Sequence, residues 1–285
     1  MLKTDIFVCD VYEVNDGDIM AIKQRVIYYS DELNDEFSGD DIVPKKIDGD
    51  YRYIRSGIFE RFCHIFFYRI IATPLAFLYM KLHFQHKIIN KHLLKEAKEK
   101  GYYIYGNHTH PLADALIPTM VNFPQAISVI VHPNNVSMPV LGRITPSLGA
   151  LPLPDDKKAC KHFMEALEQL RKKKGCIMIY PEAHIWPFYT DIRPFSDTSF
   201  RYPVKEKAAV FSLTNTYQKR RFSKKPRIVT YIDGPFYPDR TQTAKVQKEQ
   251  LRNQVYESMK KRARCNNMEI VRYVKVEKKK ETRDD

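Results

Sequence analysis

The sequence is poor in glycine and cysteine. Only 10 of its 285 residues are glycine, and no internal period or low-complexity tract is visible, which excludes a fibrous or repeat protein. The five cysteines are odd in number and form no Cys-x-x-Cys pair: Cys9, Cys63, Cys160, Cys176 and Cys265. This scatter predicts reduced, mostly buried thiols in a cytoplasmic protein, and neither a disulfide framework nor a zinc site.

Long apolar segments are scarce as well. The N-terminus is acidic and has no apolar core, so no secretory signal peptide is expected. The longest apolar run without a charge, residues 70–80, contains Pro74 and is too short for a bilayer crossing, which needs roughly 20 residues. With 44% hydrophobic residues, the chain can still bury one large or two small cores.

Basic residues are abundant, and they are unevenly placed. The net charge of +13 is the sum of −6 over residues 1–55, +8 over residues 56–218 and +11 over residues 219–285. A basic body and C-terminal part favour an anionic partner, which could be nucleic acid, an anionic lipid surface or an acidic carrier protein.

An acidic extension, residues 1–55, precedes an apolar segment with helical spacing at residues 56–84. Pro74 is expected to divide this segment into two helices, a hairpin within residues 57–83. Arg69, Lys81 and Lys87 flank the apolar side chains, which suits a membrane interface. The alternative is an ordinary buried helical hairpin.

Apolar runs of strand length and of helix length then alternate along the chain. Strands are expected at 102–105, 126–131, 176–180 and 227–232, and helices at 112–121, around 138–143, from Asp155 as N-cap to Gly175, at 205–217 and at 241–264. This alternation predicts an α/β fold with a largely parallel sheet flanked by helices. Residues 56–235 would form the main domain, and residues 236–285 a basic helix and a tail that is disordered from residue 278.

Two of the expected strands are followed by polar clusters. Asn107, His108, His110 and Asp114 come after the strand at 102–105, and Pro181-Glu182-Ala183-His184 follows the strand at 176–180. Ligands gather at the carboxyl ends of strands in such sheets. A neutral imidazole there can accept a proton from an alcohol, and a carboxylate can hold the ring and stabilise its protonated form.

The order of these clusters resembles the glycerolipid acyltransferase family, which includes the 1-acyl-sn-glycerol-3-phosphate acyltransferases. That family has an Asn-His pair with an Asp about a turn later, and a Pro-Glu pair after a later strand. The resemblance covers roughly residues 60–235. It implies transfer of a fatty acyl group from acyl-CoA or acyl carrier protein to a lysophospholipid, with 1-acyl-sn-glycerol-3-phosphate as the favoured acceptor. It implies a peripheral enzyme of phospholipid biosynthesis on the cytoplasmic face of a membrane, without a metal or other cofactor.

The first cluster departs from the family pattern, because five residues rather than four separate His108 from Asp114. His108 keeps the Asn-His pair with Asn107 and is the expected catalytic base, provided that a bulge at Pro111 absorbs the extra residue. His110 remains the alternative, because its spacing of four positions could place it on one helix face with Asp114. Backbone N–H groups near Pro111–Asp114 are candidate donors to the oxyanion.

The second cluster departs further. Pro181 and Glu182 match the family, and with Asn107 and His184 they are expected to line the substrate site. Ala183, His184 and Ile185 stand where the family has Gly, Thr and its phosphate-contacting Arg. A second family motif is seen only as residues 149–153, with Asp155 in place of a cation. The acceptor phosphate is therefore assigned to other cations, of which the candidates are Arg143, Arg193, Lys205 and Lys207.

Two other functions fit parts of the sequence. His108, His110, Asp114 and His184 are residue types that bind zinc or manganese, as in a metal-dependent hydrolase, but no helix-spaced ligand pair appears. The run Lys219-Arg220-Arg221 with Lys224-Lys225 could contact nucleic acid. No zinc finger, RNP pattern or Gly-x-x-Gly loop supports that function, so no nucleic-acid partner is expected.

Overall fold

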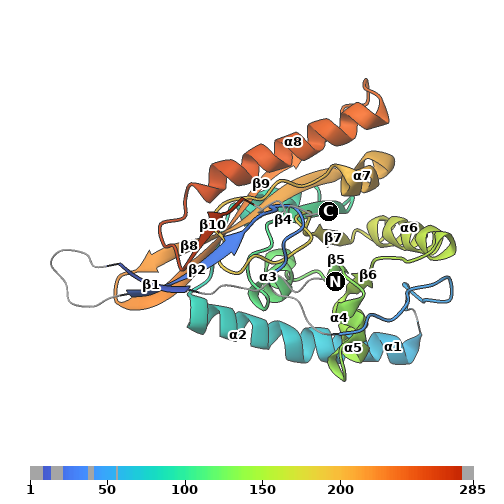
Figure 1. The fold of residues 1–285 in the computed structure, drawn as a ribbon. Helices are drawn as coiled ribbons and strands as arrows, with labels where there is room; N and C mark the ends of the chain where they lie inside the picture. Colours follow the sequence, from blue (N-terminus) through green and yellow to red (C-terminus); the bar gives the residue numbers. More distant parts are fainter. Residues whose placement is uncertain (1–8, 14–21, 38–41, 56, 278–285) are drawn as a thin grey trace, which may run out of the picture.

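The computed structural model describes residues 9–13, 22–37, 42–55 and 57–277, and its centre is a seven-stranded sheet (Figure 1). The strands lie in the order β3-β9-β8-β4-β7-β5-β6. The last five are parallel to one another, whereas β9 and β3 run in the opposite direction. Their bounds are β3 Lys87–Ile89, β4 Tyr102–Gly106, β5 Ile127–Val131, β6 Ala150–Pro152, β7 Cys176–Ile179, β8 Ala209–Arg220 and β9 Ser223–Phe236. The predicted α/β fold with a largely parallel sheet is confirmed.

Helices cover both faces of this sheet. α3 (Ala113–Asn122) lies on one face, and α6 (Lys157–Lys172), α7 (Arg201–Glu206) and α8 (Ala244–Ala263) lie on the other. Every residue of β4 is buried, with alternate side chains in the two cores, as expected for a central parallel strand. Shorter helices fill the connections: η2 (Lys91–Glu96), α4 (Asn134–Ser137), α5 (Leu141–Ile144), η3 (Thr145–Leu148) and η4 (Thr198–Phe200).

The apolar segment expected as a helical hairpin is one continuous helix. α1 (Ile58–Cys63), the π-helical η1 (His64–Ala72) and α2 (Thr73–Phe84) follow one another without a break. The division expected at Pro74 is wrong, because the wide π-helical turns directly before the proline accommodate it. There the N–H of Thr73 reaches back five residues to the Tyr68 carbonyl, which also accepts the Thr73 hydroxyl at 2.7 Å.

The helix predicted over residues 205–217 is also wrong. α7 ends at Glu206, and Lys207 turns the chain in the left-handed region with φ 52°. Residues 209–217 are completely buried in β8, between β4 and β9. The aromatic and β-branched side chains of this run suit a central strand, and this packing outweighs the local helical spacing.

Two further boundaries differ from the prediction. The helix expected around residues 138–143 is only the single turn α5. Asp156, and not Asp155, is the N-cap of α6, because its carboxylate accepts the Ala159 N–H at 2.7 Å. Asp155 instead accepts the N–H of the buried Ile47 at 2.6 Å and so fixes the acidic segment to the body.

The two ends of the chain, treated separately in the sequence, meet in a second sheet. β2 (Ile22–Tyr29) pairs antiparallel with β1 (Cys9–Glu13) and parallel with β10 (Val271–Lys275). β9 extends across the expected boundary at residue 235, and α8 packs against β8. The described parts of both ends therefore pack with the central segment. Residues 278–285, expected to be disordered, lie outside the described residues.

Candidate active site

The first cluster lies where β4 ends in the middle of the sheet. Gly106 closes the strand, and a Cβ there would lie 2.3 Å from Met178 Cε, so a larger residue would displace the flexible end of that side chain. Asn107 continues the ladder with its side chain: Oδ1 accepts the Asn215 N–H at 2.8 Å, and Nδ2 donates to the Asn215 carbonyl at 3.0 Å. This buried pairing fixes the backbone from which His108 projects.

His108 and Asp114 form a hydrogen-bonded pair. His108 Nδ1 lies 2.9 Å from Asp114 Oδ2, and the imidazole ring stacks on Tyr180 with centroids 4.4 Å apart. Because an ionised carboxylate only accepts, we assign the ring proton to Nδ1, which leaves Nε2 as an acceptor. Among the described residues, no hydrogen bond engages Nε2, and 18% of the His108 side chain is exposed. The ring is thus oriented by the carboxylate and open on its other nitrogen.

The Asp114 carboxylate is buried, and both of its oxygens accept hydrogen bonds from within the protein. Oδ2 also accepts the backbone N–H groups of Thr109 and His110, at 2.8 and 2.9 Å, and Oδ1 accepts Asn215 Nδ2 at 3.2 Å. Asp114 stands in the first turn of α3, where the helix dipole favours a negative charge. Pro111 and Leu112 form a turn between His110 and α3.

His110 does not share the carboxylate through its ring. Its Nδ1 accepts the N–H groups of Leu112 and Ala113 at 3.3 and 3.2 Å, and the ring packs edge-on against Phe84 and Phe188. Burial lowers the pKa of His110, against the opposing effect of the Asp114 charge. The geometry therefore favours His108 over His110 as the base.

The N–H groups near the start of α3 are not open to a substrate oxyanion. Those of Thr109 and His110 donate to Asp114, and those of Leu112 and Ala113 donate to the His110 ring. The Asp114 N–H donates to the His110 carbonyl. The oxyanion donors expected at Pro111–Asp114 are thus occupied within the protein.

The second cluster meets the first, because β4 and β7 are neighbours in the sheet. Glu182 Oε2 accepts the His108 N–H at 3.0 Å, and the Trp186 N–H donates to the His108 carbonyl at 3.1 Å. Glu182 is buried, and burial raises the pKa of its carboxyl above the ordinary value although Arg193 and two backbone N–H groups act in the opposite direction. Glu182 therefore holds the backbone of His108 in place through this hydrogen bond.

Arg193 does not lie where it could contact a substrate phosphate, which corrects the expectation from the sequence. Only 1% of it is exposed, and its guanidinium donates to the carbonyls of Glu182, His184 and Glu32. It lies 3.8 Å from Glu182 Oε2 and 4.8 Å above the Trp186 ring. Arg193 instead holds the loop after β7 together.

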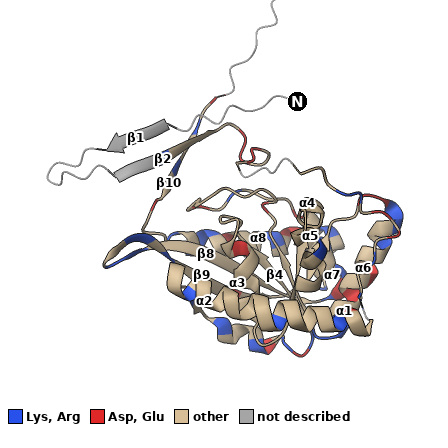
Figure 2. Cartoon of the chain, turned by 90° about the horizontal axis from the view of Figure 1, so that it is seen from below, with Lys and Arg blue, Asp and Glu red and all other residues tan. Residues whose placement is uncertain are grey.

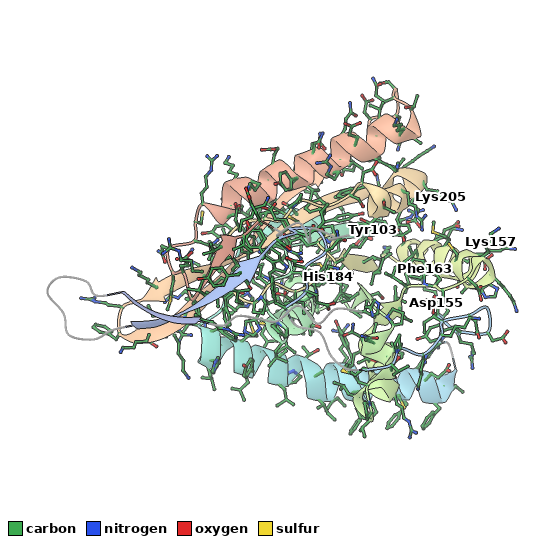
Figure 3. The ribbon with its side chains drawn as sticks, in the orientation of Figure 1. Tyr103, Asp155, Lys157, Phe163, His184 and Lys205 are labelled. Carbon is green, nitrogen blue, oxygen red and sulfur yellow. The ribbon has the colours of Figure 1, made fainter. Side chains whose placement is uncertain are left out.

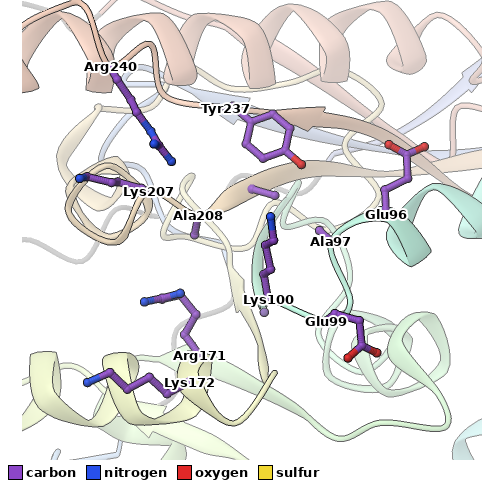
Figure 4. A pocket seen from close by; sticks show the side chains of 12 residues that line it. Glu96, Ala97, Glu99, Lys100, Arg171, Lys172, Lys207, Ala208, Tyr237 and Arg240 are labelled. Atoms are coloured by element: carbon purple, nitrogen blue, oxygen red, sulfur yellow. The ribbon is translucent and has the colours of Figure 1, made fainter.

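The other expected substrate contacts are dispersed. His184 is half-buried, 3.5 Å from Glu36 on the N-terminal segment, whereas Lys205 lies on α7, away from His184 (Figure 3). Lys207 lines a cavity of about 360 Å³ with Lys100, Arg171 and Arg240, where β4 and β8 begin (Figure 4). Lys205 and Lys207 are therefore at the opposite edge of the sheet from His108, and the structure corrects their assignment to the phosphate. Arg143 is exposed on α5.

A buried polar chain behind Asp114 was missed in the sequence. Asn215, which donates to Asp114, accepts the Thr230 hydroxyl at 2.6 Å, and Thr230 accepts His86 Nε2 at 2.8 Å. Asn215 and Thr230 are more than 100 positions from Asp114 in the sequence, and His86 precedes β3. No rule of sequence spacing therefore links these residues to Asp114. The available signal is the polar triplet at 214–216 inside an apolar run, which is unusual for the interior of a strand.

His86 should make the fold sensitive to acid. Burial, with a smaller contribution from Lys81, lowers its pKa from 6.5 to about 4, and its Nδ1 is buried without a hydrogen-bond partner among the described residues. The unfolded chain then binds more protons between these two pH values. We expect the free energy of unfolding to fall by about 3 kcal/mol from this group as pH drops from 6.5 to 4.

The matched variant is His86→Gln, which keeps an N–H donor for Thr230 but does not titrate. Denaturant unfolding of both proteins at several pH values measures the effect. The variant should lose less stability on acidification by about 3 kcal/mol. An equal loss in both proteins would assign the acid sensitivity to other groups.

The residues proposed for a metal-dependent hydrolase do not converge. Within residues 9–13, 22–37, 42–55 and 57–277, no group of three or more His, Cys, Asp or Glu side chains is arranged to hold a metal ion. His108 Nδ1 is taken by Asp114, His110 Nδ1 by backbone N–H groups, and His184 faces Glu36. The geometry is that of a hydrogen-bonded dyad.

No family model matches the sequence, and no curated protein matches it. Among solved structures, the chain is similar to the crystal structure of the 1-acyl-sn-glycerophosphate (LPA) acyltransferase PlsC from Thermotoga maritima. The TM-score is 0.48 and the sequence identity 18%, and the match covers 72% of this chain and 86% of that chain.

Proposed function

We propose that this chain is an O-acyltransferase that moves a fatty acyl group from an acyl thioester to the free hydroxyl of a lysophospholipid. The observation that carries the proposal is the His108–Asp114 pair at the end of β4, with Nε2 of the imidazole unengaged. The favoured acceptor is 1-acyl-sn-glycerol-3-phosphate, and the donor is acyl-CoA or acyl carrier protein. The resemblance of the sequence motifs to the glycerolipid acyltransferases supports this acceptor and this class of thioester donor.

The dyad can carry the whole proton transfer. His108 Nε2 takes the proton of the acceptor hydroxyl as its oxygen attacks the thioester carbonyl. Asp114 holds the ring through Nδ1 and stabilises the imidazolium. When the tetrahedral intermediate collapses, the C–S bond breaks and the thiolate leaves with the proton from His108. The products are the diacyl lipid and the free thiol, without an acyl-enzyme.

The helix from Ile58 to Phe84 supports a membrane location. The helix has 27 residues and is long and apolar enough to cross a bilayer. Only 17% of its most apolar stretch is buried in the protein. The buried side chains on this helix lie in its part from residue 68 to 84 and dock it on the body: Tyr68, Thr73, Ala76, Met80 and Phe84. We therefore propose that it lies along the membrane surface, with the enzyme peripheral on the cytoplasmic face.

The outward side of the helix has the composition for this role. Its exposed apolar side chains are Ile58, Phe59, Phe62, Ile65, Phe66, Ile70, Ile71, Leu75, Leu78 and Leu82. The α5 turn, with Val140 77% exposed, reaches the same side (Figure 1). At the C-terminal end of the helix, the ring centroids of Phe84 and His110 are 5.1 Å apart, so the helix ends beside the dyad. This arrangement would present the site to a lipid acceptor.

The direct test is a product assay with the full-length chain. Purified protein is incubated with labelled acyl-CoA and acyl carrier protein thioesters and a panel of lysophospholipids in micelles, and the products are identified by mass. We expect a diacyl product whose formation depends on the acceptor and withstands chelators. Thioester or ester hydrolysis without acyl transfer, lost on chelation and restored by zinc, would instead support the metal-dependent hydrolase.

A further inference from the structure

The turn between β8 and β9 carries a dense cluster of positive charge. Residues 219–225, here called the basic hairpin, contain five Lys or Arg residues and Phe222. Phe222 is 88% exposed, and the Arg221 guanidinium lies 5.1 Å from the centre of its ring. A large aromatic side chain held out in water among cations suits a polar–apolar boundary.

The basic hairpin lies beside the end of the membrane-facing helix. The Arg220 guanidinium donates to the His83 carbonyl, and Arg227 donates to Gln85 Oε1 at 3.0 Å. Both acceptors are in the last turn of α2 or at its C-cap, and the exposed Lys81 and Leu82 are in the same turn. Figure 2 views the molecule from the helix side and shows the turn as a cluster of Lys and Arg beyond the end of α2. The apolar helix face and the basic hairpin thus form one continuous surface.

We propose that the basic hairpin is a second membrane contact that selects anionic lipids. Phe222 inserts at the acyl boundary, and the surrounding cations contact headgroup phosphates. A nucleic acid would neutralise the same cations but would leave Phe222, Leu82 and the adjoining helix face in water, whereas a bilayer accommodates both. The inference rests on the membrane location in the proposed function and adds its lipid selectivity.

The first test places a fluorescent reporter at the tip. In Phe222→Trp, the only other tryptophan is the buried Trp186, which supplies a constant background. The matched control is Tyr237→Trp, directly after the opposite end of β9 and 56% exposed. Phosphatidylglycerol vesicles should shift the emission of Phe222→Trp to the blue and leave that of Tyr237→Trp unchanged. An unmoved Phe222→Trp spectrum would overturn the proposal, whether or not the protein binds the vesicles.

The second test measures lipid selectivity by vesicle cosedimentation. Arg221→Glu/Lys225→Glu and Phe222→Ser should each weaken binding to phosphatidylglycerol vesicles by about tenfold, with little change for phosphatidylcholine. The charge-matched control is Lys207→Glu/Arg240→Glu, at the cavity on the opposite edge of the sheet, which should bind as the parent does. Hairpin variants that bind anionic vesicles normally but lose binding to duplex DNA would identify a nucleic-acid surface instead.

Activity on micellar lysophospholipid separates the two proposals. The hairpin variants should keep the parent activity there, because no hairpin residue contacts the dyad. If the parent chain transfers no acyl group but the reporter shifts, the proposed reaction fails and the membrane contact stands. If acyl transfer is present and the reporter is silent, the membrane contact fails alone.

Discussion

His108→Ala should lower the acyl-transfer rate by about 10³-fold while the protein stays folded. General-base assistance contributes about 10²–10⁴-fold, and the ring of His110, the other imidazole of this motif, binds backbone N–H groups through Nδ1 and not the Asp114 carboxylate. Asp114 would keep three hydrogen-bond donors, so its buried charge stays compensated. Initial rates with lysophospholipid and acyl thioester measure the loss, and thermal unfolding checks the fold.

His110→Ala is the matched control, because it removes the second imidazole of the same motif. It should cost stability, about 1 kcal/mol, since the N–H groups of Leu112 and Ala113 lose their acceptor. Its rate should fall far less than that of His108→Ala. If His110→Ala removes activity and His108→Ala does not, then His110 is the base and the assignment must be reversed.

The sequence placed the two polar clusters better than their surroundings, and the reason is topological. Parallel strands place their carboxyl ends at one edge, so both polar clusters were expected at the same edge, and they meet because β4 and β7 are neighbours. The contacts of Glu182 and Trp186 with His108 depend on this adjacency. The strand at 102–105 was equally clear, because its uninterrupted apolar run matches a strand buried on both faces.

Other features were decided by tertiary packing, which local patterns do not record. The segment 205–217 has helical spacing, but its position between β4 and β9 makes it a strand. Asn215 then reaches Asp114 only because β8 lies beside β4. Arg193 is in a loop with no local sign of burial, and three backbone carbonyls converge on it only in the fold.

Arg193→Met should be among the most destabilising single changes in the chain. The substitution keeps most of the side-chain volume but removes the charge that faces Glu182 at 3.8 Å. Removal of one partner of a buried ion pair costs roughly 3–5 kcal/mol, because the other charge is left without compensation. Glu182 would keep only the N–H groups of His108 and residue 193. Denaturant unfolding should show a midpoint shifted by this free energy.

The comparison with Arg193→Met/Glu182→Gln separates the charge from the packing. If the unpaired carboxylate causes the loss, the double variant should regain part of the stability, since a neutral amide is cheaper to bury than an ion. Arg193→Lys keeps the charge but cannot reach three carbonyls at once, so an intermediate loss is expected. Equal losses in all three variants would mean that the carbonyl contacts, and not the ion pair, hold this loop. Because Glu182 also accepts the His108 N–H, a displaced carboxylate should lower the acyl-transfer rate of Arg193→Met even where the protein is still folded.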